Sequence, residues 1–388
     1  MEIYFDNAAS TKVRDEAVSA MERVMRECYG NPSSTHFMGR GASAELESAR
    51  EKIAQALGAR REEVYFTSGG TEADNWAVLG TAEALARKGR HVITSAIEHD
   101  AVLQPMKKLE KSGWEVTYIA PDSAGRIPAE AFAEALREDT VFASIMLVNN
   151  ETGAVNPMAE YSGEIKRRRL GTVLHTDAVQ GFCKIPLSAR ELGAGLITLS
   201  AHKLHGPKGV GALYVRNGIK PAPLIIGGGH ESGKRSGTEA LPAIAGFGEA
   251  AMTGSRELTA TAERIRELRG HTILRLAEEV PEAVINGGGA FAQGSPGELG
   301  SPFILNLSIP GHRSEVLMSA LESDGICVSM GAACKKGSRS RVLEAMRLKK
   351  ELIDSALRIS FSRYSTIEEA DALVAALKKA SGTLLKAR

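Results

Sequence analysis

One lysine, Lys203, follows a short apolar run and precedes a turn that contains Gly206 and Gly209. A lysine amine that is kept unprotonated can form a Schiff base with an aldehyde, so this position could bind a cofactor covalently. Taken alone, a lysine before a glycine-rich turn is more often a solvated loop residue. Other residues of the sequence are therefore needed to distinguish a cofactor-binding lysine from a solvated one.

A carboxylate stands at the end of another apolar run: Asp177, within the segment His-Thr-Asp-Ala-Val-Gln at 175–180. A buried carboxylate there could pair with a protonated pyridine nitrogen and make a cofactor ring a better electron sink. A helix N-cap is an equally good interpretation of a single aspartate at this place. The sequence leaves both interpretations open.

Two further features could contribute to such a site. The run Thr-Ser-Gly-Gly-Thr-Glu at 67–72 lies between an expected strand and an expected helix, where free backbone N–H groups suit a phosphate. A tight turn with a Ser/Thr helix cap has the same appearance. His99 could cover a flat cofactor, although a lone histidine at a helix start more often has only a structural role.

Cys334 lies in a loop of small residues and is followed by four cations within the segment KKGSRSR. Nearby positive charge lowers the pKa of a thiol and favours the nucleophilic thiolate. A small buried residue before a solvated basic run is the plainer interpretation. The other cysteines, Cys28, Cys183 and Cys327, are predicted to be structural, and the absence of any C-x-x-C pair argues against a zinc finger or a disulfide framework.

Two other patterns suggest different chemistry but are incomplete. Residues 228–234 nearly match a phosphate-binding P-loop, yet Arg235 stands where that motif needs Ser or Thr to reach magnesium. His202 and His205 could bind a metal, but no convincing third ligand accompanies them. We therefore assign no metal, and a nucleotide hydrolase is disfavoured.

The elements that must position these residues follow a regular pattern from about residue 60 onward. Short apolar runs alternate with helical patterns: the runs fall at 64–68, 91–95, 141–148, 173–177, 196–200 and 211–215, and the helices at 71–87, 100–112 and 159–169. This alternation predicts an α/β domain with a largely parallel sheet covered by helices on both faces. Ligands bind beyond the carboxyl ends of such strands, which is where the polar residues above stand.

The character of the chain changes after a glycine-rich stretch at 225–238. A long helical pattern covers about 242–279, a Gly/Pro-rich segment follows, and strands near 303–309 and 356–362 precede a final helix at about 366–380. We predict a smaller α+β domain here. The expected division is a large domain at 16–257, with 1–15 and 258–388 forming the small domain that carries the cysteine loop.

Bulk properties limit the class of protein. The chain has 388 residues, 43% of them hydrophobic and 24% charged, which predicts a globular protein. A net charge of +1 disfavours a nucleic-acid or membrane-surface binder. The start of the chain shows no signal-peptide pattern, and no stretch approaches the roughly 20 apolar residues of a membrane span. We therefore expect a cytoplasmic protein that acts on small molecules.

Taken together, the motifs resemble those of the cysteine desulfurase family, which belongs to class V of the aminotransferase-like pyridoxal-phosphate enzymes. The resemblance covers nearly the whole chain, in family order: IYFDNAAST, GNPSSTH, TSGGTEADN, EHDAV, VNNETGAV, HTDAVQ, SAHKLHGPKG, KRSGT, the cysteine loop and ALRISFS. It implies a fold type I transferase, with a mainly parallel seven-stranded sheet flanked by helices in the large domain, and it implies a homodimer.

The same resemblance implies a role for each site residue. Lys203 would bind pyridoxal 5'-phosphate, His99 would stack on its ring, Asp177 would pair with the ring nitrogen and Gln180 would bond the phenolic oxygen. The implied cofactor-binding residues are Gly70, Thr71, His99, Asn150, Asp177, Gln180, Ser200, His202, Lys203 and Thr238, the last from the partner subunit. The implied substrate-binding residues are Asn31, Asn150 and Arg358, and the implied catalytic residues are Cys334, Lys203 and His99. A bidentate arginine suits the carboxylate of the substrate.

The implied reaction converts L-cysteine to L-alanine and leaves the sulfur as a persulfide on Cys334. An acceptor protein, such as an iron–sulfur scaffold or a sulfur carrier, would then take the sulfur. The chain departs from the family in its short basic segment after Cys334, in His230 and in Ser362, so the acceptor and the turnover stay open. Selenocysteine lyase is the alternative activity. A non-catalytic sulfur scaffold is the alternative of a different class, and intact Lys203, Asp177 and Cys334 argue against it.

Overall fold

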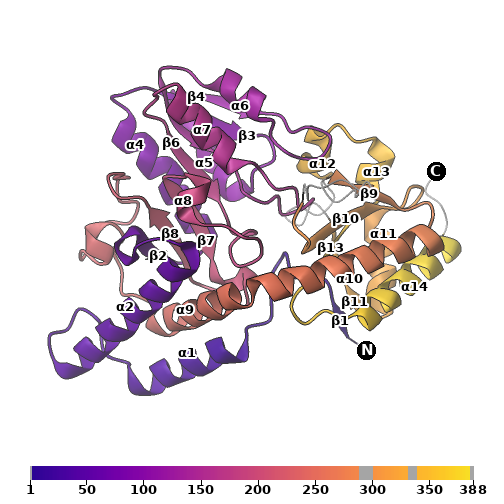
Figure 1. Cartoon of the computed structure of the whole chain (residues 1–388), viewed down its shortest axis with the longest axis horizontal. Coiled ribbons are helices and arrows are strands. Elements are labelled where there is room, and N and C mark those ends of the chain that lie inside the picture. The colour runs from indigo at the N-terminus through magenta and orange to yellow at the C-terminus, as the bar shows by residue number, and fades with distance from the viewer. Residues whose placement is uncertain (1, 288–299, 331–338, 385–388) are drawn as a thin grey trace.

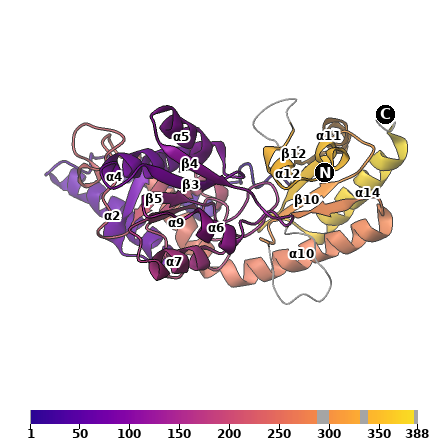
Figure 2. The same cartoon turned by 90° about the horizontal axis from the view of Figure 1, so that it is seen from above.

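The computed structural model describes residues 2–287, 300–330 and 339–384. It consists of two bodies, each built on its own sheet, which lie to the left and the right in Figure 1. Helix α10 (Leu258–Glu279) runs along the right-hand body and leads into it from α9 (Leu241–Arg256). The view from above in Figure 2 shows the same two bodies side by side, with both chain ends at the smaller one.

The larger body is organised around a seven-stranded sheet. Its order is β2 (Val64–Thr67), β8 (Gly211–Val215), β7 (Leu196–Ser200), β6 (Val173–Asp177), β5 (Thr140–Ser144), β3 (His91–Ser95) and β4 (Glu115–Ile119). The strands from β7 to β4 pair in parallel, and β8 alone runs antiparallel to both of its neighbours. The predicted mainly parallel sheet of seven strands is therefore confirmed.

Both faces of this sheet are covered by helices because its strands are apolar on both sides. On β2, Val64 and Phe66 enter one core, whereas Tyr65 between them enters the other and meets Trp76 edge-on at 5.9 Å. Side chains alternate across a strand, so neighbouring residues serve opposite helix layers. One layer holds α2 (Phe37–Leu57), α6 (Ala129–Ala135), α7 (Met158–Arg167), α8 (Ala189–Leu192) and α9, with α1 (Asp15–Glu27) packed on α9. The other holds α3 (Gly70–Asn75), η2 (Trp76–Gly80), α4 (Thr81–Leu85) and α5 (Asp100–Lys111).

The smaller body contains a four-stranded antiparallel sheet in the order β12 (Ser329–Met330), β13 (Ala356–Ser360), β10 (Ile304–Ser308) and β9 (Val284–Asn286). Beside it, β1 (Ile3–Tyr4) pairs in parallel with β11 (Ile326–Cys327). Helices α10, α11 (Ser314–Ser323) and α14 (Ile367–Thr383) cover the sheet, and α12 (Arg341–Ala345) and α13 (Lys350–Asp354) precede β13. Ile3 and Phe5 pack in this core, so the N-terminal segment belongs to the same body as the C-terminal part of the chain.

Among the differences between the structure and the expected elements, three concern strands β5 and β4 and the link to the smaller body. The apolar run 141–148 forms a strand only to Ser144, after which the chain bends while backbone N–H groups still bond to residues of β6. Strand β4 was not among the expected runs because it is a half-exposed edge strand. The helical pattern at 242–279 is divided at Glu257, whose carboxylate binds Arg14 and Arg363. The division into domains at 257 stays a prediction.

Within the described ranges, no helix combines the length and the apolar character that a membrane span requires.

Candidate active site

A cavity of about 350 Å³ lies at the carboxyl ends of β6 and β7, where the smaller body meets the larger. Ten of the residues predicted from the sequence line it: Gly70, Thr71, His99, Asn150, Asp177, Gln180, Ser200, His202, Lys203 and Arg358. Asn31 and Thr238 are exposed and do not line this cavity in the single chain. Cys334 lies outside the described residues. The structure therefore brings together most of the predicted site from segments far apart in the sequence.

Lys203 is held in a 3-10 turn, Ala201–Lys203, that directly follows β7. Gly206 makes this turn possible, because a Cβ on it would stand 2.9 Å from the carbonyl oxygen of Ala201. The Nζ of Lys203 donates to the backbone oxygens of Ala8 and Ala9, both at 2.7 Å. The turn after β7 and the N-terminal segment thus fix the amine at the cavity wall.

Asp177 ends strand β6 and is buried. Its Oδ1 accepts from the backbone N–H of Val179 at 2.9 Å, so it stabilises a turn and does not cap a helix. Burial raises the pKa of this carboxyl, while the hydrogen bond from Val179 and the nearby His99 and Lys203 act in the opposite direction. Within the described part of the chain no cation forms a salt bridge with it, so a cationic ligand would supply what it lacks.

His99 has the structural role that the sequence left open, and it also lies where a role over the cofactor would require it. It is the N-cap of α5, and its Nδ1 accepts from the N–H of Ala101 at 3.1 Å. It also lines the cavity. Because Nδ1 is an acceptor, the ring hydrogen of the neutral form is on Nε2. Stacking of this ring on a cofactor stays a prediction.

The end of the cavity near α3 carries hydroxyl and N–H donors, from Thr71, Ser200 and His202. Gly69 precedes the helix with φ of 155°, a backbone angle that favours glycine. Burial, helped by the positive charges of Lys203, Lys208 and Lys184, lowers the pKa of His202 to about 4. The imidazole is therefore neutral at pH 7 and can both donate and accept hydrogen bonds.

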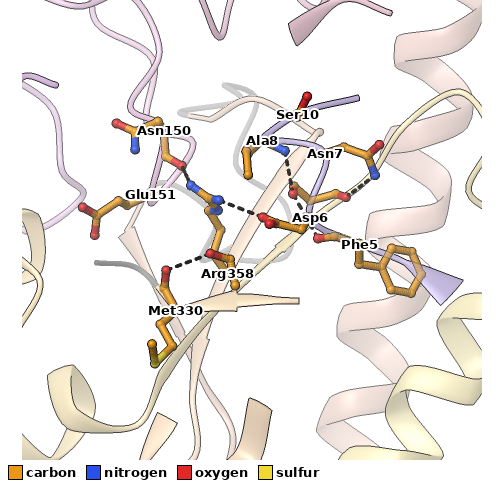
Figure 3. Close-up of polar contacts among 12 residues, drawn as sticks. Phe5, Asp6, Asn7, Ala8, Ser10, Asn150, Glu151, Met330 and Arg358 are labelled. Atoms are coloured by element: carbon orange, nitrogen blue, oxygen red, sulfur yellow. Dashed lines mark hydrogen bonds and ion pairs between the residues drawn. The ribbon is translucent and has the colours of Figure 1, made fainter. Parts of the chain in front are cut away.

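Arg358 enters the cavity from β13, the strand between β10 and β12. Its Nη1 donates to the backbone oxygen of Asn150 at 2.9 Å, and its Nη2 donates to the carboxylate of Asp6 at 2.9 Å (Figure 3). The side chain is buried, and its Nε has no hydrogen-bond partner within the described residues. A guanidinium fixed in this way is a rigid anion site at the boundary of the two bodies.

Sequence reasoning missed three charged residues at this site. Asp6 pairs with Arg358, and Lys184 is buried beside Gln180. Asp74 lines the cavity from α3, and its Oδ1 lies 3.6 Å from Nε2 of His175. Burial lowers the pKa of His175 to about 3, so the pair is not an ion pair at pH 7. Asp74 stands among other polar residues of α3, including Glu72 and Asn75, so the sequence offers no local signal that distinguishes it.

The segment that resembles a P-loop does not take that form. The carboxylate of Glu231 is buried and bonds to Arg50 at 2.8 Å. Arg235 donates to Glu72 at 2.7 and 3.0 Å, which ties the segment to α3. The described segment forms only a short 3-10 turn, Glu231–Gly233, and no α-helix starts directly after Gly233, since α9 begins at Leu241. Its charged residues are therefore used within the fold.

Comparison with known proteins gives the family. The model of the aminotransferase class-V family matches residues 3–373. A curated relative, cysteine desulfurase IscS of Dictyoglomus turgidum, is 42% identical over 370 residues, which cover 95% of this chain and 91% of the relative. This chain belongs to the cysteine desulfurase family of class-V aminotransferases. Among solved structures, a NifS-like protein aligns with this desulfurase at a TM-score of 0.92 and 38% identity, covering 99% of this chain and all of the other. A second, titled "SspA in complex with cysteine", aligns at a TM-score of 0.79 and 31% identity, covering 94% of this chain and 100% of the other.

The family uses pyridoxal phosphate, and the cavity of this desulfurase fits that cofactor. An amine is present for an aldehyde, at Lys203. Asp177 supplies a buried carboxylate for the ring nitrogen, and this carboxylate has no salt-bridge partner within the described chain. Hydroxyl and imidazole groups are present for a phosphate at the α3 end. The donor set therefore matches the three chemically distinct parts of the cofactor.

Proposed function

We propose that this desulfurase converts L-cysteine to L-alanine with pyridoxal phosphate on Lys203 and passes the sulfur to Cys334 as a persulfide. The observation that carries the proposal is the convergence of Lys203, Asp177 and Arg358 on one cavity from three separate segments. An amine, a buried carboxylate and a guanidinium are the groups that an aldehyde cofactor and an amino-acid substrate require. Relatives named cysteine desulfurase over nearly the whole chain support the choice of substrate.

Each part of the cofactor has residues to hold it. Lys203 would bind the aldehyde carbon, Asp177 the ring nitrogen and Gln180 the phenolic oxygen. Thr71, Ser200 and His202 would bind the phosphate, with Gly70 leaving room beside them, and His99 would cover the ring. When bound, pyridoxal phosphate withdraws electrons from the substrate and so acidifies the hydrogen on its Cα.

The substrate carboxylate would bind at Arg358, whose guanidinium is already held by Asn150 and Asp6. Pre-orientation of this kind lowers the entropy cost of binding a carboxylate. The exposed Asn31 remains a predicted second contact. The amine of Lys203, once the substrate has displaced it, would accept the proton from Cα, and it must be neutral to do so.

The thiolate of Cys334 would then attack the sulfur of the substrate. A sulfur–sulfur bond forms, the bond between sulfur and Cβ breaks, and its electron pair stays on carbon, which takes a proton and becomes the methyl group of alanine. Cys28, Cys183 and Cys327 do not line the cavity, and burial raises the pKa of Cys183 to about 12. A thiol with that pKa is not a nucleophile near neutral pH.

The finer assignments concern partners and location. We infer a homodimer in which Thr238 completes the phosphate site of the partner chain. Large apolar side chains are exposed near the start of α2 and in the loop that carries Thr238: Tyr29 is 75%, Phe37 72% and Ile226 88% exposed. Apolar surface of this kind favours a protein interface. We propose an iron–sulfur scaffold or another sulfur carrier as the acceptor of the sulfur, because the relatives named IscS suggest a supply of sulfur for iron–sulfur assembly. We also propose that the enzyme acts in the cytoplasm.

Mass spectrometry of the enzyme after treatment with L-cysteine tests the sulfur step. A peptide with Cys334 should gain the mass of one sulfur atom, and this gain should be removed by a reducing agent. Cys334→Ala should bind pyridoxal phosphate but form no persulfide, whereas Cys183→Ala, the matched control, should behave as the parent. A Cys334→Ala enzyme that releases sulfide at the parent rate would overturn the assignment of the nucleophile.

A further inference from the structure

Lys184 is a buried lysine for which the proposed function gives no role. It lies in the turns after β6, and its Nζ donates to Oε1 of Gln180 at 2.9 Å. Within the described ranges, no carboxylate forms a salt bridge with it. A buried ammonium without a carboxylate is unfavourable, because it loses hydration without gaining a counter-charge. Because burial of this lysine lowers the stability of the fold, we looked for a role of its side chain at the site.

The hydrogen bond to Lys184 determines how the amide of Gln180 is turned. Since Oε1 accepts from an amine, the NH2 group is at the opposite end, and it donates to the backbone oxygen of Ala8 at 2.9 Å. The same oxygen of Ala8 accepts from Lys203. The two ends of an amide have nearly the same shape, so the amine of Lys184 on one side and the carbonyl oxygen of Ala8 on the other together select the orientation. Lys184, Gln180, Ala8 and Lys203 therefore form one continuous hydrogen-bonded chain.

The charges around Lys184 are mostly positive. Burial, together with the positive charges of Lys203 and Arg358, lowers its pKa to about 7. A small cavity of about 30 Å³ beside it is also lined by the charged or titratable residues Arg14, Cys183, Lys203, His205, Glu257 and Arg363. Lys184 thus places an additional donor, and in its protonated form an additional positive charge, directly behind the amide that faces the cofactor cavity.

We propose that Lys184 is a positioning residue that holds the amide of Gln180 with its NH2 group toward the phenolic oxygen of pyridoxal phosphate. The inference rests on the proposed function, because it needs the cofactor in this cavity. A fixed donor stabilises the negative charge on that oxygen, and a cation behind the amide polarises and strengthens the donor. Without Lys184, only the carbonyl oxygen of Ala8, which also accepts from Lys203, would hold the amide in this orientation, and an amide that turned its oxygen toward the phenolic oxygen would repel it.

Two variants and their combination test this role. Lys184→Met keeps the length of the side chain and removes the donor, and Gln180→Ala removes the group through which Lys184 acts. The exposed Lys107→Met is the matched control. We expect Lys184→Met to raise the dissociation constant for pyridoxal phosphate by about tenfold, the effect of one hydrogen bond to a charged group. The absorbance of the Lys203-bound cofactor should also titrate at higher pH, because a less stabilised oxygen holds its proton longer.

The double variant distinguishes a positioning role from a general structural one. If Lys184 acts through Gln180, then Lys184→Met should change neither quantity in the Gln180→Ala background. Thermal unfolding of the cofactor-free proteins reports on folding, and Lys184→Leu is the replacement if the methionine variant does not fold. An unchanged titration in the single variant, or a full effect that persists without Gln180, would overturn the inference. A parent enzyme that shows no cofactor absorbance would instead refute the proposed function.

Discussion

The guanidinium of Arg358 and the carboxylate of Asp6 lie 2.9 Å apart although 352 positions of sequence separate them. Asp6 belongs to the N-terminal segment, and Arg358 lies on β13. This ion pair joins the two ends of the chain at the wall of the cofactor cavity. It also places a protein carboxylate on the group that is proposed to bind the carboxylate of L-cysteine.

Replacement of Arg358 by lysine should weaken substrate binding more than cofactor binding. Lysine keeps the charge but loses the planar fork that holds a carboxylate at two points. We expect Arg358→Lys to raise KM for L-cysteine by about tenfold or more, with unchanged absorbance of the bound cofactor. Steady-state kinetics with Arg339→Lys, an exposed arginine of the smaller body, as control checks this. An unchanged KM would place the carboxylate site elsewhere.

Asp177→Asn should slow the conversion of cysteine while leaving the shape of the site intact. The amide cannot supply the negative charge that stabilises a protonated ring nitrogen. We expect alanine formation to fall by about 100-fold, the range for loss of a buried charged partner in catalysis. The exposed Asp139→Asn is the control. Parent activity in Asp177→Asn would contradict the pairing of this carboxylate with the ring.

Lys203→Ala should abolish the covalent attachment of the cofactor. The expected result is loss of the visible absorbance of lysine-bound pyridoxal phosphate and a fall in alanine formation of about 10³-fold or more, since the Cα proton also loses its acceptor. Reduction with borohydride followed by peptide mapping should label Lys203 in the parent. The exposed Lys208→Ala is the control. Labelling of any other lysine in its place would show the assignment to be wrong.

Glu151 provides a prediction about stability and pH. It is buried beside Asn150, its carboxylate accepts from Ser340 at 2.5 Å, and burial raises its pKa from 4.5 to about 7. Between these two pH values the folded state retains a proton that the unfolded chain has lost, so wild-type stability falls as pH rises through this window. Relative to wild type, Glu151→Gln should therefore become more stable by on the order of 2 kcal/mol between pH 5 and 8.

Chemical denaturation at several pH values checks the sign of this effect. The exposed Glu344→Gln is the control for the loss of one carboxylate. A difference between wild type and Glu151→Gln that stays constant with pH, or that changes in the opposite direction, would show that Glu151 is ionised in the folded protein throughout this range.

The sequence was sufficient for the elements that depend on local pattern. The apolar runs that became β3, β6, β7 and β8 were located because each is buried on both faces. The polar residues at their carboxyl ends were found for the same reason, since the sheet topology brings Asp177 and Lys203 to one edge. The resemblance then supplied roles that the residues alone left open, such as those of His99 and Asp177.

The pattern could not predict contacts that form only between distant segments. Asp6 has no local signal, because its partner is 352 positions away. Lys184 bonds to Gln180 only four positions away, but the two lie in turns after β6 and not in a regular helix, so helical spacing does not indicate the contact. The bend after Ser144 likewise follows from bonds to β6, which only the folded sheet provides. Edge strand β4, half-exposed, lacks the continuous apolar run of the central strands.

The central claim is tested most directly by an absorption spectrum of the purified protein with pyridoxal phosphate, recorded before and after L-cysteine is added, with alanine and sulfide measured in the same sample under reducing conditions. We expect a visible band that changes when cysteine is added, together with alanine and sulfide in equal amounts. A protein that stays colourless with added cofactor, or that forms neither product from cysteine, would contradict it.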